Sequence, residues 1–254
     1  MHVLLTNDDG IFAPGIRALS EAFSAAGHRV SVCAPDRERS AASHSATLNV
    51  PRRAEPIDFP GAERAWAANG TPADCARLGL WLVGDDPADM VISGINRGMN
   101  MGGACIYSGT VGAAIEAAMC GTQALATSLC LEKWESEADY APAARLSVRV
   151  AEWAARHPLP LGAIYNLNVP PLPYAEIRGL VPAKLAPIFL ETPAYEAFTD
   201  SDGVGYRFLS GVPLCAFEPD SDVVKVREGY AAITKLTWDF RLNAEDSDMA
   251  EIGL

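Results

Sequence analysis

Short apolar runs alternate along the first 170 residues with stretches in which apolar residues recur at helical spacing. The apolar runs predict buried strands: one begins at Val3 and stops before Asp8, and others cover 29–34, 64–68, 89–93, 123–129 and 163–169. The strand at 89–93 is expected to break at Gly94. The helical stretches follow several of these runs and predict helices that end at Gly27, cover 72–82, run from about 113 to 119, and cover 138–157.

The order of these elements indicates how the chain is organised. A strand, a helix and a second strand within the first 35 residues form a right-handed unit with parallel strands, which is typical of an α/β fold. Beyond Pro170 the pattern changes to proline turns and alternating stretches at 223–226 and 230–234, which predict antiparallel hairpins or arms. Because such segments favour exchange between subunits, we expect at least a dimer.

Two adjacent carboxylates, Asp8 and Asp9, lie where the first strand ends. Adjacent side chains of a strand point to opposite faces, so the pair can serve one site only on a turn, where Gly10 can relieve the backbone. Two ionised carboxylates about 4 Å apart repel by roughly 4 kcal/mol at an effective dielectric near 20. With no Lys or Arg between Met1 and Ile16, a divalent cation with oxygen ligands is the natural partner, Mg²⁺ or Mn²⁺ before Zn²⁺. The alternative is an ordinary polar turn.

Further oxygen-bearing side chains follow the other predicted strands. Ser40 follows the second strand and Asn96 a later one, and the carboxyl ends of parallel strands meet at one edge of the sheet, where ligands bind. With Asp8 and Asp9 they form an oxygen-only set, typical of a hard cation that meets a phosphate. The chemistry this predicts is phosphate monoester hydrolysis.

His44, four residues past Ser40, is either a proton donor to the leaving group or an ordinary histidine of a surface loop.

Small residues crowd the segment 94–112, just ahead of a predicted helix. Such a helix N-terminus suits an anion because unpaired N–H groups and the helix dipole both face it, although close packing of the helix on the sheet would favour the same residues. Asn100, Ser108, Gly109 and Thr110 are therefore candidate substrate contacts, and as capping or turn residues they would look the same. Asn7 either braces the turn of the carboxylates or contacts substrate.

The amino-acid composition and net charge exclude some classes of binding partner and indicate where the protein is located. The 254 residues are 49% hydrophobic and carry a formal net charge of −12, which argues against nucleic-acid polymers and anionic membranes as partners. No apolar run reaches the roughly 18 residues that a membrane span needs. Six scattered cysteines form no C-x-x-C pair, and no signal-peptide pattern precedes the first strand, so we expect reduced thiols and a cytoplasmic protein.

Several ordered blocks of the sequence resemble the SurE family, the stationary-phase survival nucleotidases. They are Thr6-Asn7-Asp8-Asp9-Gly10-Ile11, Ala34-Pro35-Asp36-Arg37 with Ser40, Gly70-Thr71-Pro72-Ala73-Asp74-Cys75, Ser93-Gly94-Ile95-Asn96, and Tyr107-Ser108-Gly109-Thr110-Val111-Gly112. Gly103-Ala104-Cys105 stand where the family commonly has acidic residues, which puts catalytic efficiency and substrate preference in question.

The resemblance implies a metal-dependent 5'(3')-nucleotidase that acts on nucleoside monophosphates. It implies a Rossmann-like, doubly wound, mostly parallel catalytic core at 1–170 and an extension with hairpins at 171–254 used in oligomerisation, giving a homodimer or tetramer. By position, Asp8, Asp9, Ser40 and Asn96 correspond to the ligands of one divalent ion, Mg²⁺ or Mn²⁺, and Asp8, Asp9 and Asn96 are assigned to catalysis.

Two other functions are compatible with the same residues. The first is a non-hydrolytic nucleotide- or sugar-phosphate-binding module, similar to a glycosyltransferase domain that uses an Asp pair to hold a metal diphosphate. The second is an inactive relative that keeps the fold. A P-loop, a Gly-x-Gly-x-x-Gly motif and a Gly-x-Ser-x-Gly motif are all absent from the sequence, which weakens ATPase, dinucleotide and serine-hydrolase hypotheses.

Overall fold

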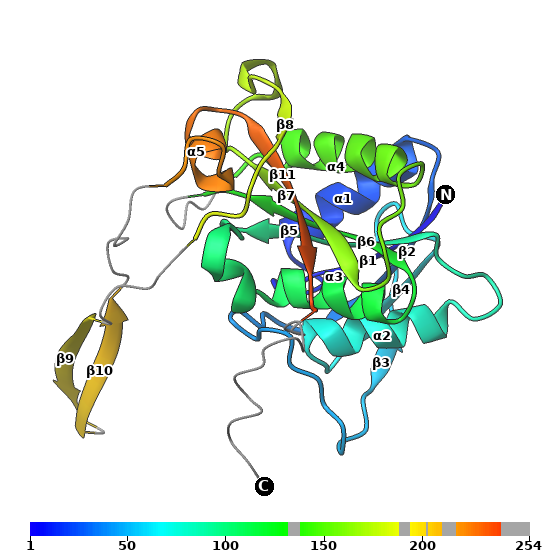
Figure 1. The fold of residues 1–254 in the computed structure, drawn as a ribbon. Coiled ribbons are helices and arrows are strands. Elements are labelled where there is room, and N and C mark those ends of the chain that lie inside the picture. The colour runs from blue at the N-terminus through cyan, green and yellow to red at the C-terminus, as the bar shows by residue number, and fades with distance from the viewer. Residues whose placement is uncertain (132–137, 188–193, 202, 210–216, 240–254) are drawn as a thin grey trace, which may run out of the picture.

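The computed structural model describes residues 1–131, 138–187, 194–201, 203–209 and 217–239. Over these residues the body is one sheet with the strand order β3-β4-β2-β1-β5-β6-β7-β11-β8 (Figure 1). Its parallel part consists of β1 (His2–Thr6), β2 (Arg29–Pro35), β4 (Arg64–Ala68), β5 (Met90–Arg97), β6 (Gln123–Leu129) and β7 (Ala163–Val169). The short strand β3 (Ala54–Pro56) pairs antiparallel with β4 at one edge.

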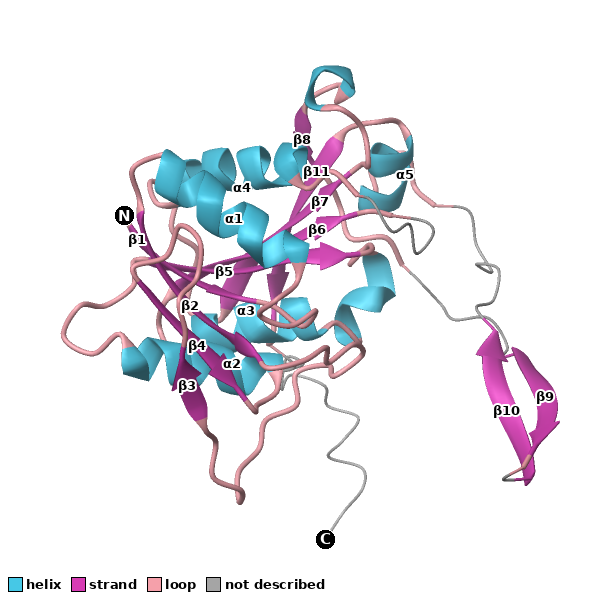
Figure 2. Cartoon of the chain, turned by 180° about the vertical axis from the view of Figure 1, so that it is seen from behind, coloured by secondary structure: helices cyan, strands magenta, loops and turns pink. Residues whose placement is uncertain are grey.

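Helices cover both faces of this sheet. In the two opposite views, α1 (Pro14–Ala25) and α4 (Ala141–Ala154) lie on one face, and α2 (Pro72–Leu82) and α3 (Gly109–Met119) on the other (Figures 1 and 2). Ile16, Leu19 and Phe23 of α1 are fully buried, as their helical spacing predicts. This arrangement confirms the predicted α/β class and the Rossmann-like, doubly wound, mostly parallel sheet.

Two local predictions were wrong. The strand expected to break at Gly94 continues to Arg97, because Gly94 at φ +135° permits an irregular register between Ser93 and Asn96 while the buried Ile95 stays in the sheet. The alternating stretch at 223–226 is not a strand but helix α5 (Asp222–Arg227), capped by the Ser221 side chain. Four residues are too few to separate a period of 2 from one of 3.6.

The chain beyond residue 170 contributes in two ways. β11 (Ala231–Thr237) pairs antiparallel with β7, and β8 (Leu180–Pro182) pairs parallel with β11, so both extend the main sheet past the predicted boundary. β9 (Ala194–Asp200) and β10 (Gly203–Leu209) form an antiparallel hairpin, which stands apart from the body in both views (Figures 1 and 2). It confirms the predicted hairpin in the C-terminal extension, although not at 223–226 or 230–234, the stretches that suggested it. The division into two domains stays a prediction.

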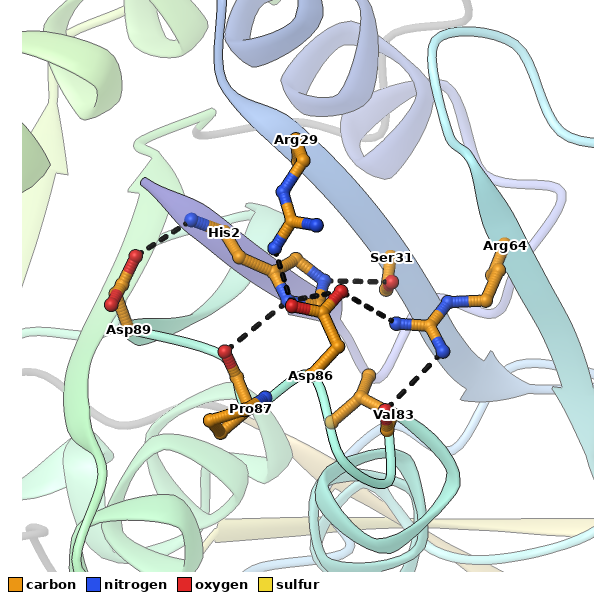
Figure 3. A network of polar contacts seen from close by, with 8 residues as sticks. All are labelled: His2, Arg29, Ser31, Arg64, Val83, Asp86, Pro87 and Asp89. Carbon is orange, nitrogen blue, oxygen red and sulfur yellow. Dashed lines mark hydrogen bonds and ion pairs between the residues drawn. The ribbon is translucent and has the colours of Figure 1, made fainter.

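A polar cluster ties together the amino-terminal edge of the sheet, opposite the carboxyl ends of the parallel strands (Figure 3). Arg29 Nη2 lies 2.6 Å from Asp86 Oδ1, and Arg64 Nη2 lies 3.3 Å from Asp86 Oδ2. His2 contacts the same carboxylate through Nδ1 at 3.6 Å, and its Nε2 lies 2.9 Å from Ser31 Oγ. The hydrogen bond from Arg29 lowers the pKa of Asp86. These contacts hold the loop after α2 to three strands and have a structural role.

Two expectations concern the environment of the protein. Cys33, Cys75, Cys105, Cys120 and Cys130 are free thiols, as predicted, and Cys215 lies outside the described residues. None of the helices in the described ranges combines the length and the apolarity needed to cross a bilayer.

Candidate functional site

The candidate site lies where the strand order reverses. From β1 the chain proceeds to β2 and β4 on one side, whereas β5, β6 and β7 follow on the other side. β1 and β5 are therefore adjacent strands whose connections lead in opposite directions, and a crevice opens beyond their carboxyl ends. Asp8 and Asp9 follow β1, and Asn96 lies near the end of β5.

A cavity of about 200 Å³ at this point is lined by all four predicted metal ligands, Asp8, Asp9, Ser40 and Asn96. The remaining lining residues are Ala41, Arg97, Asn100, Ala104, Tyr107 and Ser108. The structure thus gathers oxygen donors from three separate parts of the chain around one space. Their binding of a metal stays a prediction.

The turn after β1 explains how adjacent carboxylates reach the same cavity. Gly10 adopts φ +98°, and the buried Asn7 clamps the turn: its Nδ2 donates to the Gly10 carbonyl at 2.8 Å, and its Oδ1 accepts from the Gly10 N–H at 3.2 Å. Asp8 is 5% exposed, and its Oδ1 accepts a hydrogen bond from the Thr110 hydroxyl. Asp9 Oδ2 accepts from the Arg97 N–H at 3.0 Å. Asn7 therefore braces the turn and does not line the cavity.

The electrostatics of the pair favour a cation. Burial raises the pKa of Asp8, against the opposing hydrogen bond from Thr110. Burial, followed by the charge of Asp8, raises the pKa of Asp9 to about 6. The positive charge of Arg97 opposes the shift of Asp9 without cancelling it, and a divalent ion between the two carboxylates would supply further compensation.

The donor set fits a hard ion. Within the described ranges no three His, Cys, Asp or Glu side chains cluster as metal ligands, so the two carboxylates must be completed by neutral oxygens. Asn96 donates through Nδ2 to the Gly98 carbonyl at 3.0 Å, so its Oδ1 is the atom that could serve as a ligand. The Ser40 hydroxyl donates to Glu38 Oε1 at 2.5 Å and keeps its lone pairs for a metal. Carboxylate, amide and hydroxyl oxygens suit Mg²⁺ or Mn²⁺.

The N-terminus of α3 forms the opposite wall. Ser108 is its N-cap and accepts from the Val111 N–H at 3.0 Å. A Cβ added at Gly109 would lie 2.8 Å from the Asp8 Cβ, so only glycine lets the helix approach this closely. Of the predicted substrate contacts, Asn100 and Ser108 line the cavity, whereas Gly109 and Thr110 contact Asp8. The N–H groups of Gly109 and Thr110 at this helix end hydrogen-bond the Asp8 carboxylate, and the Val111 N–H is taken by Ser108, so the helix end holds Asp8 in place.

The sequence analysis did not select Arg97 or Tyr107 as site residues. Arg97 lines the cavity and also a neighbouring one of about 310 Å³, which Asp9, Phe12 and Tyr140 line as well. Its position was visible in the sequence, because it is a basic residue directly after Asn96 in a chain of net charge −12. Tyr107 lies inside the block that resembles the SurE family and directly precedes the N-cap of α3.

His44 does not line this cavity. Its Nε2 lies 2.7 Å from Glu116 Oε2 in α3, and Arg77 Nε donates to Glu116 Oε1 at 2.6 Å. On the same loop, Ser43 donates through Oγ to the Ile106 carbonyl at 2.6 Å. These contacts hold the loop that carries Ser40 against α3, so the structure gives His44 a positioning contact.

Replacement of Glu116 should show how much its contacts with His44 and Arg77 contribute to the free energy of unfolding. The hydrogen bonds from His44 and then Arg77 lower the pKa of Glu116 below its ordinary 4.5, so the ionised form stabilises the fold above that pH, and this contribution disappears as the pH falls through the lowered value. Because Arg77 and His44 are partly exposed, we expect Glu116→Gln to lower the free energy of unfolding by about 1 kcal/mol at pH 7.

Urea unfolding over a pH series measures this difference, which should close below pH 4.5. The matched control is Glu21→Gln, whose partner Arg17 forms an exposed pair one helical turn away, and it should change stability by less than about 0.5 kcal/mol. A Glu116 variant that matches this control at pH 7 would contradict the account.

Fold and site together define an α/β protein whose loops gather carboxylate, amide and hydroxyl oxygens around one cavity beside the N-terminus of α3. Comparison with known proteins agrees. The family model described as "Survival protein SurE" matches residues 3–188, and the chain belongs to this family.

Individual relatives match over nearly the whole length. The chain is 43% identical to the 5'-nucleotidase SurE of Synechococcus sp. (strain JA-3-3Ab), covering 100% of this chain and 98% of the relative. It is 44% identical to the 5'-nucleotidase SurE of Gloeobacter violaceus, covering 94% and 90%. The crystal structure of the SurE protein from Aquifex aeolicus superposes with a TM-score of 0.83 at 31% identity and covers 99% of both chains.

Proposed function

We propose that the protein is a metal-dependent 5'(3')-nucleotidase that hydrolyses nucleoside monophosphates to nucleoside and phosphate. The names of the full-length relatives support nucleotidase activity. The observation that carries the metal requirement is the convergence of Asp8, Asp9, Ser40 and Asn96 on one cavity beside the N-terminus of α3. Nothing in the fold or the comparisons favours the non-hydrolytic binding module.

The chain's own residues divide the work. Asp8, Asp9, Ser40 and Asn96 would hold the ion, and Thr110 and the Arg97 N–H fix the orientation of the two carboxylates. The bound Mg²⁺ or Mn²⁺ would polarise the phosphoryl group and lower the pKa of an attacking water. Ser108 and Asn100 would orient the phosphoryl oxygens, while the N–H groups that open α3 hold the Asp8 carboxylate. The charge of Arg97 would attract the anion to the crevice in an otherwise acidic protein.

The most direct test of function is phosphate release from a panel of 5'- and 3'-nucleoside monophosphates, with and without EDTA. We expect release to fall by about 100-fold or more on chelation and to return with Mg²⁺ or Mn²⁺, because the ion stabilises the developing charge. Release that survives chelation would remove the metal requirement. Nucleotide binding without turnover would favour the binding module, and neither binding nor turnover would leave an inactive relative.

We also propose that the protein is a homo-oligomer and that it is located in the cytoplasm. The hairpin β9–β10 stands apart from the body (Figure 1) and carries the exposed side chains Tyr195, Val204 and Tyr206, which supports contact with a second copy of the chain in a homodimer or tetramer. Light scattering at micromolar concentration should therefore give at least twice the mass of one chain, and a monomer would end this part. The free thiols support a cytoplasmic location.

A further inference from the structure

We propose that Asp222 is a positioning residue for the substrate loop, which we define as residues 98–108, and that it ties this loop to the base of the hairpin arm. The arm base is residues 183–186 together with 218–222. The inference rests on the proposed function, since the loop carries one wall of the candidate site. Asp222 itself does not line that cavity.

Asp222 joins three backbone segments through one carboxylate. It is fully buried. Its Oδ2 accepts from the Gly102 N–H at 3.0 Å, and its Oδ1 accepts from the N–H groups of Ala186 at 3.0 Å and Val223 at 2.9 Å. Burial raises the pKa of Asp222, and these backbone donors oppose that shift. A buried carboxylate is costly unless donors surround it, so its position is fixed by all three segments together.

The arm base is itself a closed unit. Asp222 donates its N–H to the Lys184 carbonyl at 2.8 Å, and Lys184 donates its N–H to the Asp220 carbonyl at 3.0 Å. Lys184 Nζ also lies 2.9 Å from Asp220 Oδ2 on the surface. In the sequence, β9 and β10 lie between the two segments of the arm base, 183–186 and 218–222.

Apolar packing joins the same two parts independently of the carboxylate. Met101, which directly precedes Gly102, is buried in a small cluster with Ala186, Val223, Val226 and Ala232. The cluster is separate from the two larger cores of the sheet. The start of the substrate loop is thus held to the arm base by a side chain and by a hydrogen bond.

Asn100, which precedes Met101 in the loop, is held by two asparagines of β7. The Asn100 carbonyl accepts from Asn166 Nδ2 and Asn168 Nδ2, both at 2.9 Å, and the Asn100 N–H donates to Asn168 Oδ1 at 3.0 Å. With Asn100 anchored to β7 and Gly102 to Asp222, the path of the chain toward Ala104, Tyr107 and Ser108 is determined. These are the residues that line the cavity opposite the carboxylates.

The test is Asp222→Asn, with Asp220→Asn as the matched control. The amide keeps the shape of the side chain but offers one acceptor in place of two, so the Gly102 N–H faces a donor. Because the loop would contact the phosphate equally in the ground state and the transition state, we expect KM for nucleoside monophosphates to rise about tenfold while kcat changes less than about threefold. Asp220→Asn removes only the exposed pair with Lys184 and should leave both constants unchanged.

A raised KM with a nearly unchanged kcat distinguishes a positioning role of Asp222 from a role in stability alone. A variant that is simply less well folded loses kcat in proportion to its inactive fraction and keeps the KM of the wild type, and that result would overturn the proposal. So would an equal effect of Asp220→Asn. Should Asp222→Asn fail to fold, Met101→Ala removes the packing but leaves the carboxylate satisfied, and it should raise KM several-fold with kcat retained; an unchanged KM would count against the proposal.

Hydrogen exchange on the full chain provides a readout that does not need activity. In Asp222→Asn the amides of 101–108 and of Ala186 should exchange faster than in the wild type and in Asp220→Asn, whereas those of β1 and β6 should not. Unchanged exchange at 101–108 would overturn the tether even if the protein is a nucleotidase. Faster exchange in a protein that releases no phosphate would instead keep the tether and remove the proposed function.

Discussion

Asp9→Asn should lower kcat/KM for nucleoside monophosphates by about 100-fold or more while the protein stays folded, because the variant removes one of only two charged donors in the candidate metal set. The asparagine keeps an oxygen that can accept from the Arg97 N–H, so the turn after β1 is preserved. It also removes one member of a buried pair of like charges, and we expect no loss of thermal stability in the metal-free protein.

Phosphate release and thermal unfolding, measured on the same preparation, check both halves of this expectation. The matched control is Asp36→Asn, which makes the same change on the same edge of the sheet, in the lining of the neighbouring cavity and outside the ligand set. It should leave kcat/KM within about threefold, with only the ion pair to Arg39 lost. An Asp9 variant as active as this control would refute the role assigned to the carboxylate.

Gly15→Ala should lower the free energy of unfolding by about 3 kcal/mol or more. Gly15 lies in the first turn of α1, and a Cβ added there would overlap the carbonyl oxygen of Ile95 in β5. Ile95 is fully buried in the sheet and cannot move away, so the substitution must push α1 from β5, beside the crevice. For a protein of this size we expect Tm to fall by about 6–12 °C.

The matched control for steric overlap is Gly27→Ala. Gly27 adopts φ +81° at the end of α1, but a Cβ there would meet no atom within 4 Å, so only the cost of the left-handed conformation, about 1 kcal/mol, applies. Thermal and urea unfolding of the two variants should rank Gly15→Ala well below Gly27→Ala. Equal losses would mean that the close contact between α1 and β5 does not hold the edge of the site.

The regular parts of the fold followed from local pattern. β6 and β7 match their predicted ranges, because apolar residues predominate in both even though each strand also carries buried polar side chains. The pattern misled where a segment was short or irregular, as at 223–226 and at the bulge after Ser93. A single glycine with positive φ can end a strand or bend it, and the sequence alone does not separate the two outcomes.

The convergence of Asp8, Asp9, Ser40 and Asn96 on one cavity could be predicted, because parallel strands bring their carboxyl ends to a common edge. The contacts that hold these side chains in place could not. Thr110 reaches Asp8 across 102 positions of sequence, and Asp222 reaches Gly102 across 120. No local spacing encodes a pair so distant, since both depend on how α3 and the arm base pack against the finished sheet.

The central claim is that oxygen donors from separate loops form one site for a hard divalent ion. Mn²⁺ binding to the full-length protein without substrate, followed by electron paramagnetic resonance and calorimetry, tests it most directly. We predict one Mn²⁺ per chain, displaced by Mg²⁺, with affinity lowered at least tenfold by Asp9→Asn and unchanged by Asp36→Asn. Binding that is absent from the wild type, or that Asp9→Asn leaves intact, would contradict the claim.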